Sequence, residues 1–132
     1  KEEAIEEANY VLTLVKPYNI TYPIAIDVEA IENDSFRQEN LSASELTDVI
    51  IAFCDTIKAA GYTPLIYSNL LYFMDNVELE RLEGYDKWFA GYQTASPYYP
   101  YKYAMWQYTS TGSINGVSGN IDINIAMKKL KK

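Results

Sequence analysis

Apolar residues recur along positions 2–16 with the period of an α-helix, and polar residues occupy the opposite face of that helix. Pro17 follows this stretch, and because a proline ring cannot continue a helix, the pattern predicts that the helix ends there. Residues 23–28 then form an apolar run that is typical of a strand covered on both faces in a parallel sheet. The N-terminal part of the chain is therefore predicted to be a helix followed by a buried strand.

The clearest helix signal begins at Ser42, which together with Glu45 has the spacing of a capping box. An apolar stripe at helical spacing follows, and it consists of Leu46, Val49, Ile50, Phe53, Ile57 and Ala60. Gly61 stands where a helix C-cap is expected, and residues 64–67 have the pattern of a second strand. The order strand, helix, strand predicts a βαβ unit with a right-handed crossover.

The C-terminal half contains more strand signals than helix signals. A short helix is predicted after Asn69, and a helical turn is predicted around Leu79 and Leu82. Three further strands are predicted at residues 87–92, 104–108 and 120–125.

The connections between these last strands, at 93–103 and 109–119, are 11 residues each. Their Pro, Gly and Ser content rules out a regular helix in either connection. Asn115-Gly116 in the second connection predicts a hairpin, so the last strand is expected to run antiparallel to its neighbour. The sequence thus predicts an α/β sheet of about five strands whose later connections lack helices, followed by a short basic helical end at 126–132.

Composition narrows the chemistry that such a fold can perform. The chain of 132 residues is long enough for one domain, and it contains no His and a single Cys, Cys54. These counts exclude Ser-His-Asp and Cys-His catalysis, His metal sites, an internal disulfide and a Cys-cluster zinc site. Cys54 lies in the middle of the second predicted helix and is interpreted as a small buried hydrophobic residue. Carboxylates, hydroxyls, amides and aromatic rings remain, with no cofactor or metal expected.

Charge narrows the possible partners. The balance of 11 Lys and Arg against 18 Asp and Glu gives a net charge of -7, which argues against nucleic acid or an anionic membrane surface. No apolar run reaches the roughly 18 residues that a membrane helix needs, so membrane insertion is not expected. The acidic, amphipathic residues 1–4 are unlike a signal peptide.

Two carboxylates, Asp27 and Glu29, lie at the end of the first predicted strand. Residues i and i+2 of a strand project to the same face, and the carboxyl end of a parallel strand is where α/β folds place their sites. A nearby pair of carboxylates is also the machinery of glycoside hydrolysis, with one protonated as general acid and the other ionised. The alternative is that the two acids only mark the turn from the strand into a polar loop.

A third acid, Asp122, lies between Ile121 and Ile123 in the last predicted strand. By itself it can equally be a turn acid or a capping residue. If the first and last strands converge, three carboxylates share one cleft, and their repulsion raises the pKa of at least one of them. A divalent-metal site is disfavoured because such sites usually add backbone and amide oxygens that the sequence does not place.

Aromatic residues accompany the predicted strands, and flat rings with a polar group can stack on sugars. Candidate sugar-binding residues are Tyr67, Trp88, Tyr92, Trp106 and Gln107. The alternative for Trp88 and Trp106 is packing in the core. The amide of Gln107 is suited to bonding hydroxyl or acetamido groups.

Five sequence blocks resemble glycoside hydrolase family 25, the muramidases or lysozymes of bacterial cell walls and phage. They are IDVE at 26–29, PLIYSN at 64–69, WFAGY at 88–92, MWQYTS at 105–110 and NGVSGNIDIN at 115–124. The resemblance implies a modified, TIM-like β/α barrel that has fewer helices than strands and an antiparallel last strand. It also implies cleavage of the β-1,4 bond between N-acetylmuramic acid and N-acetylglucosamine in peptidoglycan.

Carried over residue by residue, the resemblance implies that Glu29 is the general acid. Asp27 matches a neighbouring carboxylate that orients the substrate acetamido group or stabilises the transition state, and Asp122 matches the aspartate on the last strand. Tyr67 matches a tyrosine of the sugar-binding cleft. The implied partner is the glycan strand of peptidoglycan, outside the cell or in its wall, or at lysis if the protein is a phage endolysin.

The resemblance also departs from the family at the front of the chain. The family opens with a strand that bears another active-site aspartate, and no such motif precedes residue 1. A full β/α barrel needs at least about 200 residues, so residues 1–132 are expected to be a partial catalytic domain without its first strands. The strand at 24–28 would then be an unpaired edge, so the chain is expected either to pair edge to edge with another copy or to be a product of truncation or proteolysis. A glycan-binding remnant without catalysis is the alternative function.

Overall fold

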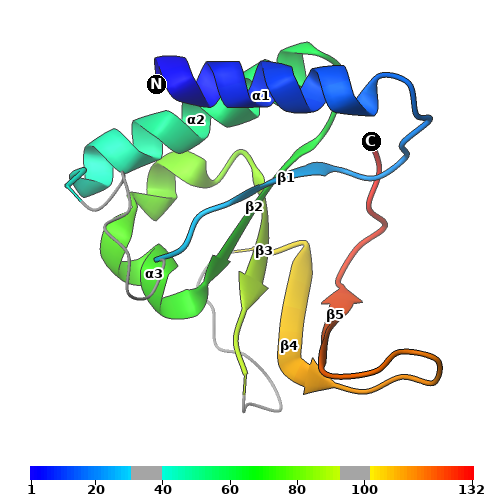
Figure 1. Cartoon of the computed structure of the whole chain (residues 1–132). Helices are drawn as coiled ribbons and strands as arrows, with labels where there is room; N and C mark the ends of the chain where they lie inside the picture. The colour runs from blue at the N-terminus through cyan, green and yellow to red at the C-terminus, as the bar shows by residue number, and fades with distance from the viewer. Residues whose placement is uncertain (31–39, 93–101) are drawn as a thin grey trace.

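A computed structural model describes residues 1–30, 40–92 and 102–132 of the chain. The described elements, in chain order, are α1 (Glu2–Val15), β1 (Ile24–Asp27), α2 (Ala43–Ala59), β2 (Pro64–Asn69), α3 (Leu70–Asn76), the 3-10 helix η1 (Leu79–Leu82), β3 (Asp86–Ala90), β4 (Met105–Gly112) and β5 (Ile121–Ala126). Figure 1 shows them along the chain.

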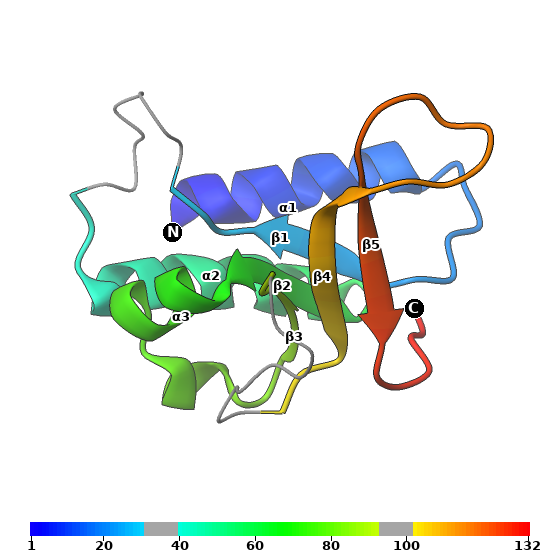
Figure 2. The same ribbon diagram turned by 90° about the horizontal axis from the view of Figure 1, so that it is seen from below.

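The five strands form one sheet in the order β1-β2-β3-β4-β5. Neighbouring strands are parallel from β1 to β4, and β5 pairs antiparallel to β4. The sheet curls into half of a barrel, which is visible when Figures 1 and 2 are compared. The predicted α/β class, the strand count and the antiparallel last strand are confirmed.

Local interactions explain where the helices begin and end. The Ser42 backbone N–H donates to the Glu45 carboxylate over 2.9 Å, and the Glu45 N–H donates to Ser42 Oγ over 3.3 Å, so the predicted capping box is present. Gly61 follows α2 with φ at 85°, a left-handed conformation that favours glycine. Asn69 caps α3 by accepting a 2.8 Å hydrogen bond from the Tyr72 N–H.

The helices gather on one side of the sheet, and the hydrophobic core lies between them and the sheet (Figures 1 and 2). Ile26 of β1, Ile66 of β2 and Phe89 of β3 point into this core from successive strands. Cys54 of α2 is fully buried there, and its burial raises the pKa of the thiol to about 12. Cys54 therefore packs as a small hydrophobic residue, as the sequence predicts.

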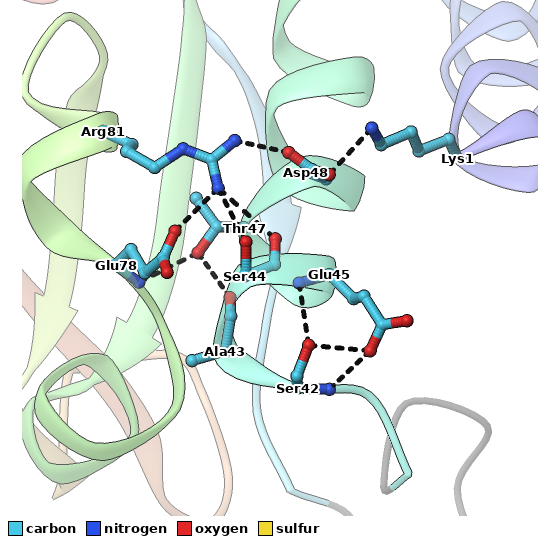
Figure 3. A network of polar contacts seen from close by, with 9 residues as sticks. All are labelled: Lys1, Ser42, Ala43, Ser44, Glu45, Thr47, Asp48, Glu78 and Arg81. Carbon is cyan, nitrogen blue, oxygen red and sulfur yellow. Dashed lines mark hydrogen bonds and ion pairs between the residues drawn. The ribbon is translucent and has the colours of Figure 1, made fainter.

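A polar network joins the two long helices to η1 (Figure 3). Asp48 of α2 accepts from Lys1 over 2.8 Å and from Arg81, which also pairs with Glu78 over 2.7 Å. The buried Thr47 hydroxyl accepts a 2.9 Å bond from the Glu78 N–H. Hydrogen bonds from Lys1 and Arg81 hold the pKa of Asp48 below its usual range. These contacts hold the helix layer in register and lie away from β4 and β5.

The prediction of a helical end at 126–132 is wrong. Strand β5 continues to Ala126, and residues 127–132 are not helical. Lys128 pairs with Asp86 over 2.5 Å, and Lys132 lies 4.2 Å from the centre of the Tyr62 ring. A helix would crowd four lysines together, whereas the irregular tail gives two of them separate partners.

The strand bounds also shift by a few residues. Strand β4 extends to Gly112, so the hairpin connection is shorter than predicted, with a turn at Asn115-Gly116. Gly116 has φ at 92°, as the predicted turn requires. The predicted connection at 93–103 lies mostly outside the described residues.

Strand β1 lies at one edge of the described sheet and is paired with β2 alone. Because an edge strand presents unpaired backbone groups, we predict that the chain of 132 residues associates through β1 when it is expressed by itself. Multi-angle light scattering is expected to give at least twice the chain mass of 15.1 kDa. Replacing Ala25 by proline should restore the monomer, and a wild-type chain that is monomeric would contradict the prediction.

Candidate active site

The side chains of β1 alternate between the helix-covered core and the opposite side of the sheet. Ile26 and Val28 are buried toward the helices, so Asp27 and Glu29 project to the other side. Two bonds hold this strand end, because the Val28 N–H donates to the Tyr67 carbonyl and the Val28 carbonyl accepts from Ser68 Oγ over 2.5 Å. The predicted sharing of one face by the two carboxylates follows from this geometry.

The side of the sheet opposite the helices is called the open face here, and no helix covers it in the described part of the chain (Figure 2). Strand register places Asp27 beside Tyr67 and Tyr67 beside Trp88, in one row across β1, β2 and β3. The rings of Tyr67 and Trp88 meet edge to face, with centroids 4.8 Å apart. The row therefore sets an aromatic pair directly beside a carboxylate.

Gln107 of β4 lies on the same open face, one row further along the strands. It is 3% exposed, and its Oε1 accepts a 2.9 Å bond from the Tyr67 hydroxyl and a bond from the Tyr92 hydroxyl. Asn124 of β5 is its register partner, and Asn124 Oδ1 accepts a 2.8 Å bond from Trp88 Nε1. Side chains from β2, β3, β4 and β5 thus form a connected polar layer.

Asn124 is a residue that the sequence analysis did not single out. It follows Asp122 by two positions in β5, so the two side chains project to the same side. Asp27 and Glu29 have the same spacing at the end of β1. This repeated spacing is the signal that could have identified Asn124. Its partner Trp88 could not be predicted from the pattern.

The pKa shift of Glu29 indicates that the three predicted carboxylates lie near one another. Burial raises the pKa of Glu29 above its usual value, and the negative charges of Asp27 and Asp122 raise it further. Burial also raises the pKa of Asp27. Asp122 comes from the last strand and acts on Glu29 at the end of the first, so the curl of the sheet brings the two strand ends toward each other.

Trp106 is separated from the other predicted sugar-binding residues. It is 8% exposed, pairs in register with Phe89 on the helix side of the sheet and belongs to the hydrophobic core. Its Nε1 donates a 2.9 Å hydrogen bond to the Gly91 carbonyl. Because Gln107 follows it directly, strand alternation sends these neighbours to opposite faces, and the core alternative holds for Trp106.

No group of three or more Cys, Asp or Glu side chains that could hold a metal ion occurs among residues 1–30, 40–92 and 102–132. In the same part of the chain, every helix is too short or too polar to span a membrane.

Comparison with protein families bears on the identity of this fold and site. The family model described as "Glycosyl hydrolases family 25" matches residues 1–117. The chain belongs to glycosyl hydrolase family 25. The match contains the elements that carry Asp27, Glu29, Tyr67, Trp88 and Gln107, and it ends just before β5 and Asp122.

Relatives of this family 25 domain include an autolytic lysozyme, an endolysin and an autolysin. An autolytic lysozyme of Clostridium acetobutylicum is 25% identical over 118 residues, which are 89% of this chain and 34% of that protein. The CTP1L endolysin has a TM-score of 0.73 and 26% identity, with 94% of this chain and 41% of that chain covered. The autolysin LytC of Streptococcus pneumoniae has a TM-score of 0.75 and 27% identity, with 93% of this chain and 30% of that chain covered.

These coverages describe how much of the family fold is present. The chain spans 34%, 41% and 30% of these three proteins, whereas about nine tenths of the chain is matched in each case. The family 25 domain of this chain is therefore similar to a part of each relative, and the part includes the curled sheet and its helix layer.

Proposed function

We propose that the protein is a peptidoglycan muramidase that cleaves the β-1,4 bond between N-acetylmuramic acid and N-acetylglucosamine. Membership of a glycosyl hydrolase family supports hydrolysis of a glycosidic bond. The relatives support a cell-wall substrate, because they include an autolytic lysozyme and an autolysin, LytC, that was crystallised with a synthetic peptidoglycan ligand. We further propose that residues 1–132 are a single, partial catalytic domain.

The observation that carries the proposal is the raised pKa of Glu29. Desolvation and two neighbouring carboxylates favour the protonated form of this side chain, so it keeps its proton to a higher pH than an exposed glutamate. A general acid for glycoside cleavage must hold a proton that it can transfer to the leaving oxygen. The raised pKa and the two neighbouring carboxylates therefore support Glu29 as the proposed acid.

Asp27 and Asp122 have a different role in this mechanism. Positive charge develops on the sugar ring in the oxocarbenium-like transition state, and ionised carboxylates beside the ring stabilise it. Asp27 is also placed to orient the acetamido group, because it lies in the same row as Tyr67 and Trp88. The same charges raise the pKa of Glu29, so one arrangement serves both requirements.

The remaining open-face residues are proposed to bind sugar. Tyr67, Trp88 and Tyr92 present aromatic rings with polar groups, and Gln107 links the two tyrosine hydroxyls. Peptidoglycan glycan strands are the proposed partner, outside the cell or in its wall, or at lysis in the case of an endolysin.

Product analysis tests the proposed bond. Purified peptidoglycan is digested with the shortest form of the protein that clears cell walls, and the new reducing ends are reduced with borohydride and identified by mass spectrometry. We expect reduced N-acetylmuramic acid at the new ends. Reduced N-acetylglucosamine would overturn the bond assignment, and glycan binding without new reducing ends would favour a glycan-binding remnant.

A further inference from the structure

The hydroxyl groups of Tyr67 and Tyr92 converge on a single acceptor atom. Both donate to Oε1 of Gln107, over 2.9 Å from Tyr67 and 2.5 Å from Tyr92. Gln107 is 3% exposed, so its oxygen has little access to water. Tyr67 of β2 and Tyr92, which follows β3, are thus joined through one buried amide.

The strand register explains how Gln107 reaches Tyr67. Strand β3 lies between β2 and β4, and its residue opposite Gln107 is Ala90. Ala90 presents only a methyl group, which leaves room for the long Gln107 side chain to extend across β3 toward β2. A larger residue in place of Ala90 would occupy the path of that side chain.

The chemistry of the three groups determines what they can offer to a ligand. An amide oxygen has two lone pairs and no proton, so it can accept one bond from each tyrosine. A phenolic hydroxyl has a single proton, and once that proton is donated, the oxygen can only accept further bonds. The two tyrosine oxygens are then left as hydrogen-bond acceptors.

We propose that Gln107 is a positioning residue that directs the hydroxyl protons of Tyr67 and Tyr92 away from the ligand, so that both tyrosines select hydrogen-bond donors of a glycan. Such donors are the hydroxyl groups and the amide N–H groups of N-acetylated sugars. This inference rests on the proposed function and extends it, because it assigns a polarity to one part of the sugar-binding surface.

The surroundings of Tyr67 support this assignment. Burial raises the pKa of Tyr67, and the nearby Tyr92 and the Glu29 carboxylate raise it further. Tyr67 therefore keeps its proton to a higher pH than a free tyrosine does, and the proton remains available for Gln107. The carboxylates beside it add further acceptors, so this part of the open face is rich in lone pairs.

Two substitutions separate an accepting amide from other roles of the side chain. Gln107→Glu keeps the length and provides oxygens that accept from both tyrosines, whereas Gln107→Leu fills similar space without any acceptor. If the amide nitrogen faced the tyrosines instead, Gln107→Glu would reverse the direction of both hydrogen bonds, and it would weaken glycan binding as Gln107→Leu does. The comparison between the glycan affinities of the two variants therefore shows whether the side chain at 107 accepts hydrogen bonds from the tyrosines.

The experiment measures binding of chitotetraose, a β-1,4-linked N-acetylglucosamine tetramer, to the 132-residue chain by calorimetry. We expect Gln107→Leu to weaken binding by about 10- to 30-fold, which corresponds to the loss of two oriented hydrogen bonds. We expect Gln107→Glu to stay within about threefold of the wild type. Tyr67→Phe should weaken binding in the wild type and have little further effect in the Gln107→Leu background.

Controls separate this inference from the proposed function and from loss of folding. Tyr85→Phe removes a tyrosine hydroxyl that donates to Asp55 in the helix layer, and it should leave binding unchanged. Equal binding by Gln107→Leu and the wild type, or equal losses in Gln107→Leu and Gln107→Glu, would overturn the inference alone. If Gln107→Leu does not fold, as judged by its melting transition, Gln107→Glu and Tyr67→Phe decide the question. A folded wild-type chain that binds no chitotetraose would overturn the inference, whereas the product analysis above decides the proposed function.

Discussion

Replacement of Glu29 by glutamine is expected to reduce peptidoglycan hydrolysis by about 10³-fold, which is within the range for loss of a general acid. Glutamine has the same shape as glutamic acid but no proton that it can transfer at neutral pH. The substitution also removes the repulsion among Glu29, Asp27 and Asp122, so the melting temperature should not fall. The measurement is the release of reducing ends from purified cell walls.

Glu7→Gln is the matched control for this prediction. Glu7 is exposed on α1, and its replacement changes the net charge by the same amount without touching the open face. We expect this variant to keep full activity. Undiminished hydrolysis by Glu29→Gln would overturn the assignment of Glu29 as the acid.

Replacement of Asp122 by asparagine is expected to lower activity by about 10²-fold, as when one group that stabilises transition-state charge is lost. It should also change the pH dependence of hydrolysis. Glu29 must be protonated to donate, so activity falls as the pH rises through its pKa. Because the Asp122 charge raises that pKa, its removal lowers the pKa and moves the alkaline limb of the profile to lower pH.

The pH profile distinguishes this mechanism from simple damage to the site. Asp75→Asn on α3 removes the same charge from an exposed position in the helix layer and should leave the profile unchanged. An Asp122→Asn variant with reduced activity and an unmoved alkaline limb would show that Asp122 does not act on Glu29.

Much of the fold could be predicted because local interactions specify it. The capping box at Ser42 and Glu45 and the left-handed Gly61 are short-range features, and they set the ends of α2. The failed prediction at 126–132 concerns a segment whose conformation depends on distant partners. Asp86 and Tyr62 bind two of its lysines, and neither lies near the segment in sequence.

The placement of side chains on the open face was likewise predictable only where it depends on local spacing. Asp27 and Glu29 share a side because strand alternation is a local property, so two residues of spacing were enough to predict it. The same alternation separates Trp106 from Gln107, but the sequence could not say which of them faces the helices. Packing against the helices decides it, because the helix layer buries the Trp106 ring and leaves the Gln107 amide on the open face.

The sequence by itself determined the helices, the parallel strands and the projection of Asp27 and Glu29 to the same side, because each depends on residues that are close along the chain. Only the tertiary structure decided that the Asp122 charge reaches Glu29 and that Gln107 joins Tyr67 to Tyr92. These contacts span 93 residues for Asp122 and 40 for Tyr67, and they depend on the curl of the sheet and on the register of its strands.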